Sequence, residues 1–174
     1  MIKKIGLPIT DKDIEGLKAG DAVLLSGKLL TGRDAAHKRI VEAIKSDSLP
    51  FDINGMAIYY VGPCPAKEGS VIGSCGPTTS YRMDPYAPTL MDNGLKAMIG
   101  KGGRSKEVTE AIIRNKCVYF AAIGGAGAMY SKQVKAAKVI AYEDLGTEAV
   151  RELMVEDFPV IVAIDSKGNC VYEK

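Results

Sequence analysis

The sequence lacks several features that would place it at once in a common functional class. Its four cysteines contain no CxxC pair, whereas zinc ribbons and ferredoxins use closely spaced cysteines. Its longest apolar runs, such as residues 159–164, have the length of a strand and are too short to cross a membrane. Its formal net charge of +2 is too small to favour nucleic acid. We therefore expect neither a membrane span nor a nucleic-acid partner, and we interpret the cysteines as buried or incidental thiols.

What remains is an ordinary globular composition. Of the 174 residues, 47% are apolar and 25% are charged, as in typical soluble domains. This length favours one domain, which we expect to extend over residues 1–174. The first residues are basic but lack the apolar segment and cleavage site of an export signal. We therefore expect a cytoplasmic protein.

Hydrophobic periodicity and turn residues predict both strands and helices. Strands are expected at Lys3–Ile9, Asp21–Leu30, Met56–Val61, Ser70–Ser74, Lys96–Ile99 and Lys116–Ile123, and in a closing hairpin of Val160–Ile164 with Cys170–Tyr172. Helices are expected at Asp11–Lys18, Pro88–Asn93 and Thr147–Met154, and after the capping residues Asp34 and Ser105. Because strands occur in adjacent pairs as well as in alternation with helices, we expect a mixed α and β fold of class α/β rather than a doubly wound sheet.

Two local details follow from residue types. Ser26 and Gly27 interrupt an apolar strand and predict a bulge there. Glu110 and Arg114 have the i,i+4 spacing of an ion pair on one helix face.

Two loops concentrate the polar chemistry of the chain. The segments 76–84 and 100–105 place hydroxyl, guanidinium and ammonium groups among glycines and a proline. Loops of this composition commonly lie at the ends of rigid elements, where binding sites are built. Cations of both kinds suit an anion that carries more than one carboxylate or phosphate. The two loops therefore predict a site for such an anion.

Five side chains share the position just after a predicted strand or its break. They are Arg33, Thr78, Thr79, Arg82 and Lys101. The glycines beside Lys101 let backbone N–H groups approach a ligand closely. Each cation taken alone is more often a solvated surface residue, but their common setting favours a shared site.

Other candidates have simpler alternatives. His37, the only histidine, falls on an apolar helix face, where it is either a core residue or a residue that supports nearby Arg33. Arg104 and Ser105 are interpreted as a loop anchor and a helix cap, although Arg104 could also contact a ligand. The segment 124–130 resembles a dinucleotide-binding loop, but Tyr130 occupies the place of the third glycine. A tight turn is the simpler interpretation there.

Three segments together resemble the signatures of one family. They are Ser26–His37, Gly76–Asp84 and Lys101–Ser105. The chain is similar to the class I, iron–sulfur-dependent fumarate hydratases and L-tartrate dehydratases, and more specifically to their β subunit, which is equivalent to the C-terminal domain of the single-chain enzymes. The likeness extends in order and spacing across nearly the whole chain. Tyr81 is a departure, because many relatives carry a small residue there.

The resemblance implies half of an enzyme. In the family, a [4Fe-4S] cluster is carried by a partner α subunit rather than by this chain, and its open iron acts as a Lewis acid on the substrate. The β part would hold the other end of a small dicarboxylate through Arg33, Thr78, Arg82 and Lys101. Thr78 is the family's candidate for proton transfer, and its neighbour Thr79 could exchange roles with it.

The resemblance further implies a swivelling β/β/α domain and an α2β2 assembly. The expected activity is the reversible hydration of fumarate to L-malate by a hydro-lyase that requires both subunits. L-tartrate or mesaconate is an alternative substrate. A non-catalytic dicarboxylate-binding module is the alternative from a different functional class.

Overall fold

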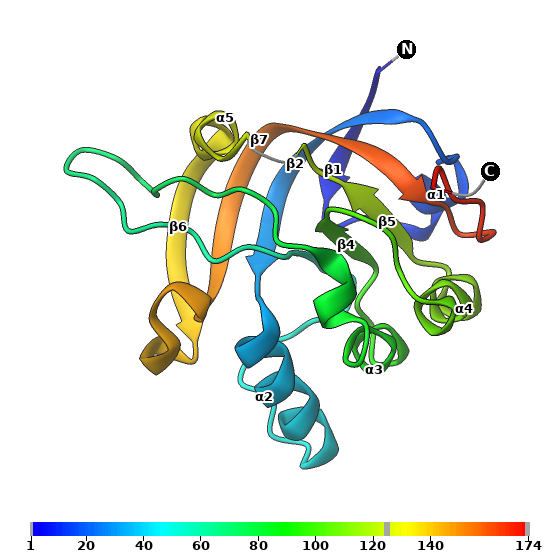
Figure 1. Cartoon of the computed structure of the whole chain (residues 1–174), viewed down its shortest axis with the longest axis horizontal. Helices are drawn as coiled ribbons and strands as arrows, with labels where there is room; N and C mark the ends of the chain where they lie inside the picture. Colours follow the sequence, from blue (N-terminus) through cyan, green and yellow to red (C-terminus); the bar gives the residue numbers. More distant parts are fainter. Residues whose placement is uncertain (1, 124–125, 173–174) are drawn as a thin grey trace.

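The fold is built from strands whose side chains alternate between two apolar layers. A computed structural model describes residues 2–123 and 126–172 (Figure 1). Its strands are β1 (Ile2–Leu7), β2 (Ala22–Thr31), β3 (Ala57–Tyr59), β4 (Ala97–Gly100), β5 (Val118–Ala121), β6 (Val134–Ala141) and β7 (Val150–Ile164). Its helices are α1 (Asp11–Glu15), α2 (Asp34–Lys45), α3 (Ala87–Asp92), α4 (Lys106–Asn115) and α5 (Gly127–Gln133), with short 3-10 turns η1 (Ser80–Met83) and η2 (Glu143–Glu148).

The strand pairings close on themselves. Strands β1 to β5 pair in parallel in chain order, and β7 runs antiparallel to β5, to β2 and to β6. The circuit β2-β3-β4-β5-β7 is therefore continuous, and β1 and β6 extend it at its margins. The predicted mixed α and β class is confirmed.

Two cores share strands β3 to β5. One face of these strands packs against β2 and β7, and its large residues include Tyr59, Ile99, Phe120, Leu25 and Phe158. The opposite face packs against α2, α3 and α4, which lie together on one side of the strands (Figure 1), and its residues include Ile58, Met98, Tyr119, Ile40, Leu90 and Ile112. The result is a β/β/α order of layers, as expected from the family resemblance.

The parallel strands place their carboxyl ends at one edge of the sheet. Strand β2 ends at Thr31, β3 at Tyr59, β4 at Gly100 and β5 at Ala121. The loops that follow these ends carry the predicted site residues. None of the helices described here has the length and apolar composition that a membrane span requires.

Three predicted elements are wrong. The strand Cys170–Tyr172 of the closing hairpin is only a single bridge between Ile164 and Cys170, followed by a turn. Residues 147–154 do not form a helix, because Val150 begins the fifteen-residue strand β7, which pairs with both β2 and β6. Pairing with two strands outweighs the local helix preference. Residues 70–74 form no strand but belong to a long connection, in which the Cys64 amide donates to the Ser74 carbonyl at 2.9 Å. The predicted bulge is confirmed by the register shift between Leu25 and Gly27.

Two predicted local contacts are also wrong. Helix α2 has Arg33 rather than Asp34 as its N-cap, and Arg33 makes no capping bond with its side chain. Arg114 does not pair with Glu110, because its guanidinium binds the carboxylate of Asp92 at 2.9 Å. Ser105 does cap α4, since its hydroxyl accepts a hydrogen bond from the Val108 amide.

Candidate functional site

Backbone hydrogen bonds fasten the threonine loop to the ends of two strands. The Thr78 amide donates to the Tyr60 carbonyl at 2.7 Å, and the Ser80 amide donates to the Lys101 carbonyl at 2.9 Å. Between them, Thr79 forms a parallel bridge with Lys101. The backbone of the threonine loop therefore lies beside that of Lys101 at the edge of the sheet where β3 and β4 end.

A glycine makes this approach possible. A Cβ atom at Gly100 would collide with the Ser80 hydroxyl and would lie 2.8 Å from the Tyr60 ring. Any side chain at this position would push the threonine loop away from β4. The sequence Gly100-Lys101 thus brings the loop and the lysine together.

The two arginines reach this edge from α2 and η1. The side chain of Arg33 runs past Gly62, where an added Cβ would lie 3.0 Å from Arg33 Cδ. The Nε atom of Arg82 lies 3.1 Å from a carboxylate oxygen of Asp34, which connects η1 to the first turn of α2. Asp34 was predicted only as a helix cap; its position directly after Arg33 was the one sequence signal for this contact. All four predicted binding residues are thus brought to one edge.

Three of the four buried polar side-chain atoms that lack partners in the described residues lie at this edge, and the fourth is the Tyr142 hydroxyl. Among the described residues, Arg33 Nε, Asp34 Oδ1 and His37 Nε2 are buried and have no hydrogen-bond partner. Buried polar groups are normally satisfied, so each exception needs an explanation. All three belong to the N-terminal turn of α2, which indicates that the site is completed by a group outside this chain or by water.

Two of the three cations of the site, Arg82 and Lys101, are open to solvent, whereas Arg33 is partly buried. The Arg82 side chain is 48% exposed, and Lys101 is exposed with no ion-pair partner in residues 2–123 and 126–172. Tyr81, the departure from the family pattern, is 65% exposed. The edge is therefore an open surface that can receive both an anion and a second polypeptide.

Arg104 has a different environment. Its side chain is completely buried, with Nε donating to Asp84 at 2.7 Å and Nη2 donating to the Tyr60 hydroxyl at 3.0 Å. Its guanidinium also lies over the Tyr119 ring. The other Asp84 oxygen accepts from the Ser105 amide at 2.7 Å. Arg104 is thus a loop anchor whose guanidinium is enclosed rather than presented to a ligand.

His37 lies beneath the site loop. It is completely buried, its Nδ1 lies 2.8 Å from the Arg33 carbonyl, and its ring packs edge-on against Tyr60. Burial lowers the pKa of His37 to about 4, and nearby Arg104 lowers it as well, although the bond to Arg33 opposes the shift. The ring is therefore neutral near pH 7.

Two of the four cysteines, Cys75 and Cys117, are buried thiols that do not suit an iron–sulfur cluster. Burial raises the pKa of Cys75 to about 11 and that of Cys117 to about 12, whereas cluster ligands must be thiolates. The Cys117 thiol lies 3.2 Å from the Leu95 carbonyl, to which it donates. Within the described residues, no three His, Cys, Asp or Glu side chains could hold a metal ion together.

The possible dinucleotide-binding loop after β5 lies partly outside the described residues. Residues 124 and 125 lie outside the described residues. Tyr130 is completely buried, its hydroxyl donates to the Pro159 carbonyl at 2.8 Å, and its ring stacks on Phe158 at 4.5 Å. Tyr130 is therefore a packing residue.

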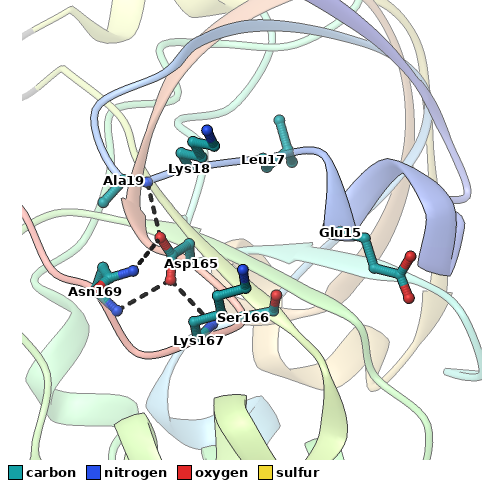
Figure 2. A pocket seen from close by; sticks show the side chains of 8 residues that line it. All are labelled: Glu15, Leu17, Lys18, Ala19, Asp165, Ser166, Lys167 and Asn169. Atoms are coloured by element: carbon teal, nitrogen blue, oxygen red, sulfur yellow. Dashed lines mark hydrogen bonds between the residues drawn. The ribbon is translucent and has the colours of Figure 1, made fainter.

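A cavity of about 310 Å³ is lined by residues that belong to none of these loops (Figure 2). It lies between the loop before β2 and the turn after β7, at the edge where the parallel strands begin. Its one buried charge, Asp165, accepts hydrogen bonds from Ala19, Lys167 and Asn169. Burial would raise the pKa of Asp165, but these bonds outweigh it and lower the pKa. Asp165 is therefore a fully satisfied turn anchor.

Comparisons with known proteins point to one family. A family model described as the fumarase C-terminus matches residues 2–174. A Methanocaldococcus jannaschii protein named as an L(+)-tartrate dehydratase subunit beta is 43% identical, over 95% of this chain and 89% of its own length. Fumarate hydratase 2 of Leishmania major is 40% identical over 89% of this chain, and the aerobic class I fumarate hydratase of Escherichia coli K12 is 38% identical over 86%. The chain spans only 28% of the length of each of these two enzymes.

Proposed function

The chain belongs to the fumarase C-terminus family, and on that premise we propose that it is the β subunit of an iron–sulfur-dependent hydro-lyase. The proposed reaction is the reversible hydration of fumarate to L-malate, carried out together with an α subunit. One observation supports the proposal: Arg33, Thr78, Arg82 and Lys101 all lie in loops or turns that meet at one edge of the sheet. Convergent cations suit a substrate with two carboxylates.

The cations are proposed to bind the carboxylates of the substrate and to stabilise the negative charge that develops during the reaction. Lys101 and Arg82 are exposed and free to approach a carboxylate, and the buried Nε–H of Arg33 has no acceptor among the described residues. Dehydration of malate removes a weakly acidic proton from C3, and negative charge develops on the neighbouring carboxylate. Guanidinium and ammonium groups that lie beside that carboxylate stabilise the charge most in the transition state.

Thr78 is the proposed proton-transfer residue. Its amide is fixed to Tyr60 at the end of β3, which holds its hydroxyl at the edge. A threonine hydroxyl is a weak base, so it needs a carboxylate or histidine of the partner to accept the proton. Thr79, fixed to Lys101 by the adjacent bridge, is the alternative for this role.

The remaining parts of the enzyme are assigned to an α subunit. We place the [4Fe-4S] cluster there, because the buried, high-pKa thiols of Cys75 and Cys117 are poor ligands. The unpartnered polar atoms on α2 also support a site completed by a second chain. An α2β2 assembly in the cytoplasm is proposed, since two-fold symmetry is the commonest closure of such oligomers.

L-tartrate is the second candidate substrate. The relative named as a tartrate dehydratase subunit is a separate chain of similar length, 89% of which is covered. The two fumarate hydratases are much longer chains. Hydroxyl or methyl substituents that distinguish tartrate and mesaconate from malate would be recognised largely by the partner.

Anaerobic reconstitution tests the proposal. The chain is mixed with its cluster-loaded α subunit and assayed with fumarate, L-malate, L-tartrate and mesaconate. We expect no turnover by this chain alone and turnover by the pair, with the preferred substrate deciding between the two hydro-lyases. Dicarboxylate binding by this chain alone, with no turnover when the α subunit is added, would instead favour a non-catalytic binding module.

A further inference from the structure

His37 holds the carbonyl group of Arg33 in two ways. Its backbone N–H donates to the Arg33 carbonyl at 2.9 Å, as the first hydrogen bond of α2. Its ring atom Nδ1 lies 2.8 Å from the same oxygen. A carbonyl has two lone pairs, so one residue occupies both. The peptide plane that follows Arg33 is therefore fixed by His37.

The hydrogen bond also fixes the state of the ring. A carbonyl oxygen can only accept, so Nδ1 must carry the proton, and in a neutral imidazole Nε2 is then the unprotonated atom. The ring cannot turn easily, because Tyr60 packs edge-on against it with ring centres 5.3 Å apart. On the side of the loop, a Cβ at Gly32 would lie 3.5 Å from His37 Cε1. The ring is held directly under the residues that lead into Arg33.

We infer that His37 is the positioning residue of Arg33: it fixes the backbone from which the Arg33 guanidinium is directed at the substrate. This inference rests on the proposed function. Arg33 is the N-cap of α2 but makes no capping bond with its side chain, so its direction is set by the backbone and by the passage beside Gly62. A small rotation of the Arg33 peptide would displace a guanidinium at the end of a long side chain.

Three substitutions test the inference in the reconstituted pair. His37→Leu fills the buried position with an apolar side chain and removes the ring donor. We expect it to lower kcat/KM by about ten- to hundredfold, as misplacement of a binding group by 1 Å does. His37→Asn places an amide N–H near the position of Nδ1 and should restore kcat/KM close to that of the unmodified pair. Ile40→Ala, at a buried position of the same helix, is the matched control that should lower Tm without changing kcat/KM.

The outcomes separate this inference from the proposed function. An active unmodified pair in which His37→Leu retains full kcat/KM, while its Tm falls as in Ile40→Ala, would leave His37 as a packing residue and overturn the inference alone. An unmodified pair without turnover on any of the four acids would overturn the proposed function. If His37→Leu does not fold, nitrogen NMR of the ring in the full chain decides: the Nδ1–H form supports the inference, and the Nε2–H form excludes the contact with Arg33.

Discussion

Two arginine–aspartate pairs lie at the same edge of the sheet and differ in almost every physical respect. The Arg104–Asp84 pair is 2.7 Å long, with side chains 0% and 12% exposed. The Arg82–Asp34 pair is 3.1 Å long, with side chains 48% and 35% exposed. Both arginines lie in the glycine-rich loops that the sequence singled out. Residue type and position alone therefore do not separate them.

The two pairs differ in how completely each arginine is satisfied by the protein. Arg104 has left water entirely, and that cost is offset by Asp84, the Tyr60 hydroxyl and the Tyr119 ring. Arg82 keeps much of its hydration and makes one ion pair, so part of its guanidinium remains available to a ligand. The satisfied arginine holds the loop, and the incompletely satisfied one is suited to bind.

The largest effect on stability is expected at the buried pair. Arg104→Ala leaves the Asp84 charge without its main partner and should lower the free energy of unfolding by about 3–5 kcal/mol. Urea denaturation of the full chain measures this. Arg114→Ala is the control, because the Arg114–Asp92 pair is 53% and 46% exposed and should cost no more than about 1 kcal/mol. A loss of similar size in both variants would remove the distinction between the pairs.

The largest effect on turnover is expected at the exposed cations. Arg82→Ala and Lys101→Ala should each lower kcat of the reconstituted pair by about 10²- to 10³-fold, since each removes a group that stabilises developing charge. The free energy of unfolding should change by less than about 0.5 kcal/mol, as at other surface sites. Steady-state kinetics measures the first and urea denaturation the second. Near-normal turnover in either variant would remove that residue from the site, and Lys106→Ala, a nearby exposed lysine, controls for a general effect of charge.

The sequence predicted which loops lie together at one edge better than it predicted the environment of each side chain in them. Glycine and proline mark Gly76–Asp84 and Gly100–Ser105 as loops, because these residues adopt backbone conformations that helices and strands exclude. Runs of apolar residues likewise marked most strands. Whether an arginine in such a loop is buried depends on residues distant in sequence: Arg104 is enclosed by Tyr60 and Tyr119, which come from other parts of the sheet. No local pattern contains that information.

The errors in the predicted elements also arise from contacts between residues that are distant in sequence. Residues 147–154 have a composition compatible with a helix, but Leu153 pairs with Leu29 of β2 on one side and with Ala137 of β6 on the other. The pairing with β2 joins segments that are more than one hundred residues apart along the chain. The strand β6 was missed because its burial does not alternate cleanly. Both strands are specified by tertiary contacts rather than by their own residues.

The third prediction concerns the pH dependence of stability at His37. In the folded chain burial lowers its pKa to about 4, from 6.5 in an exposed ring. Between these pH values the unfolded chain binds a proton that the folded chain does not, so stability must fall as pH falls through this range. The loss should approach roughly 3 kcal/mol relative to His37→Asn, which has no titrating ring. Urea denaturation of both proteins from pH 7.5 to 4 measures it, and parallel curves would place His37 in contact with water.

The smallest effect is expected when Asp34 is changed to Asn. The substitution keeps the size of the side chain but removes the charge that faces Arg82 and the N-terminus of α2. An exposed ion pair and a charge at a helix terminus each contribute about 1 kcal/mol or less. Stability should therefore fall only slightly, and less at high salt, while KM should rise by no more than about fivefold. Glu42→Gln, an exposed position further along the same helix, is the control. If Asp34→Asn instead reduces kcat as much as Arg82→Ala does, then Asp34 takes part in proton transfer, and its unpartnered oxygen would replace the partner's carboxylate or histidine as the group that accepts the proton from Thr78.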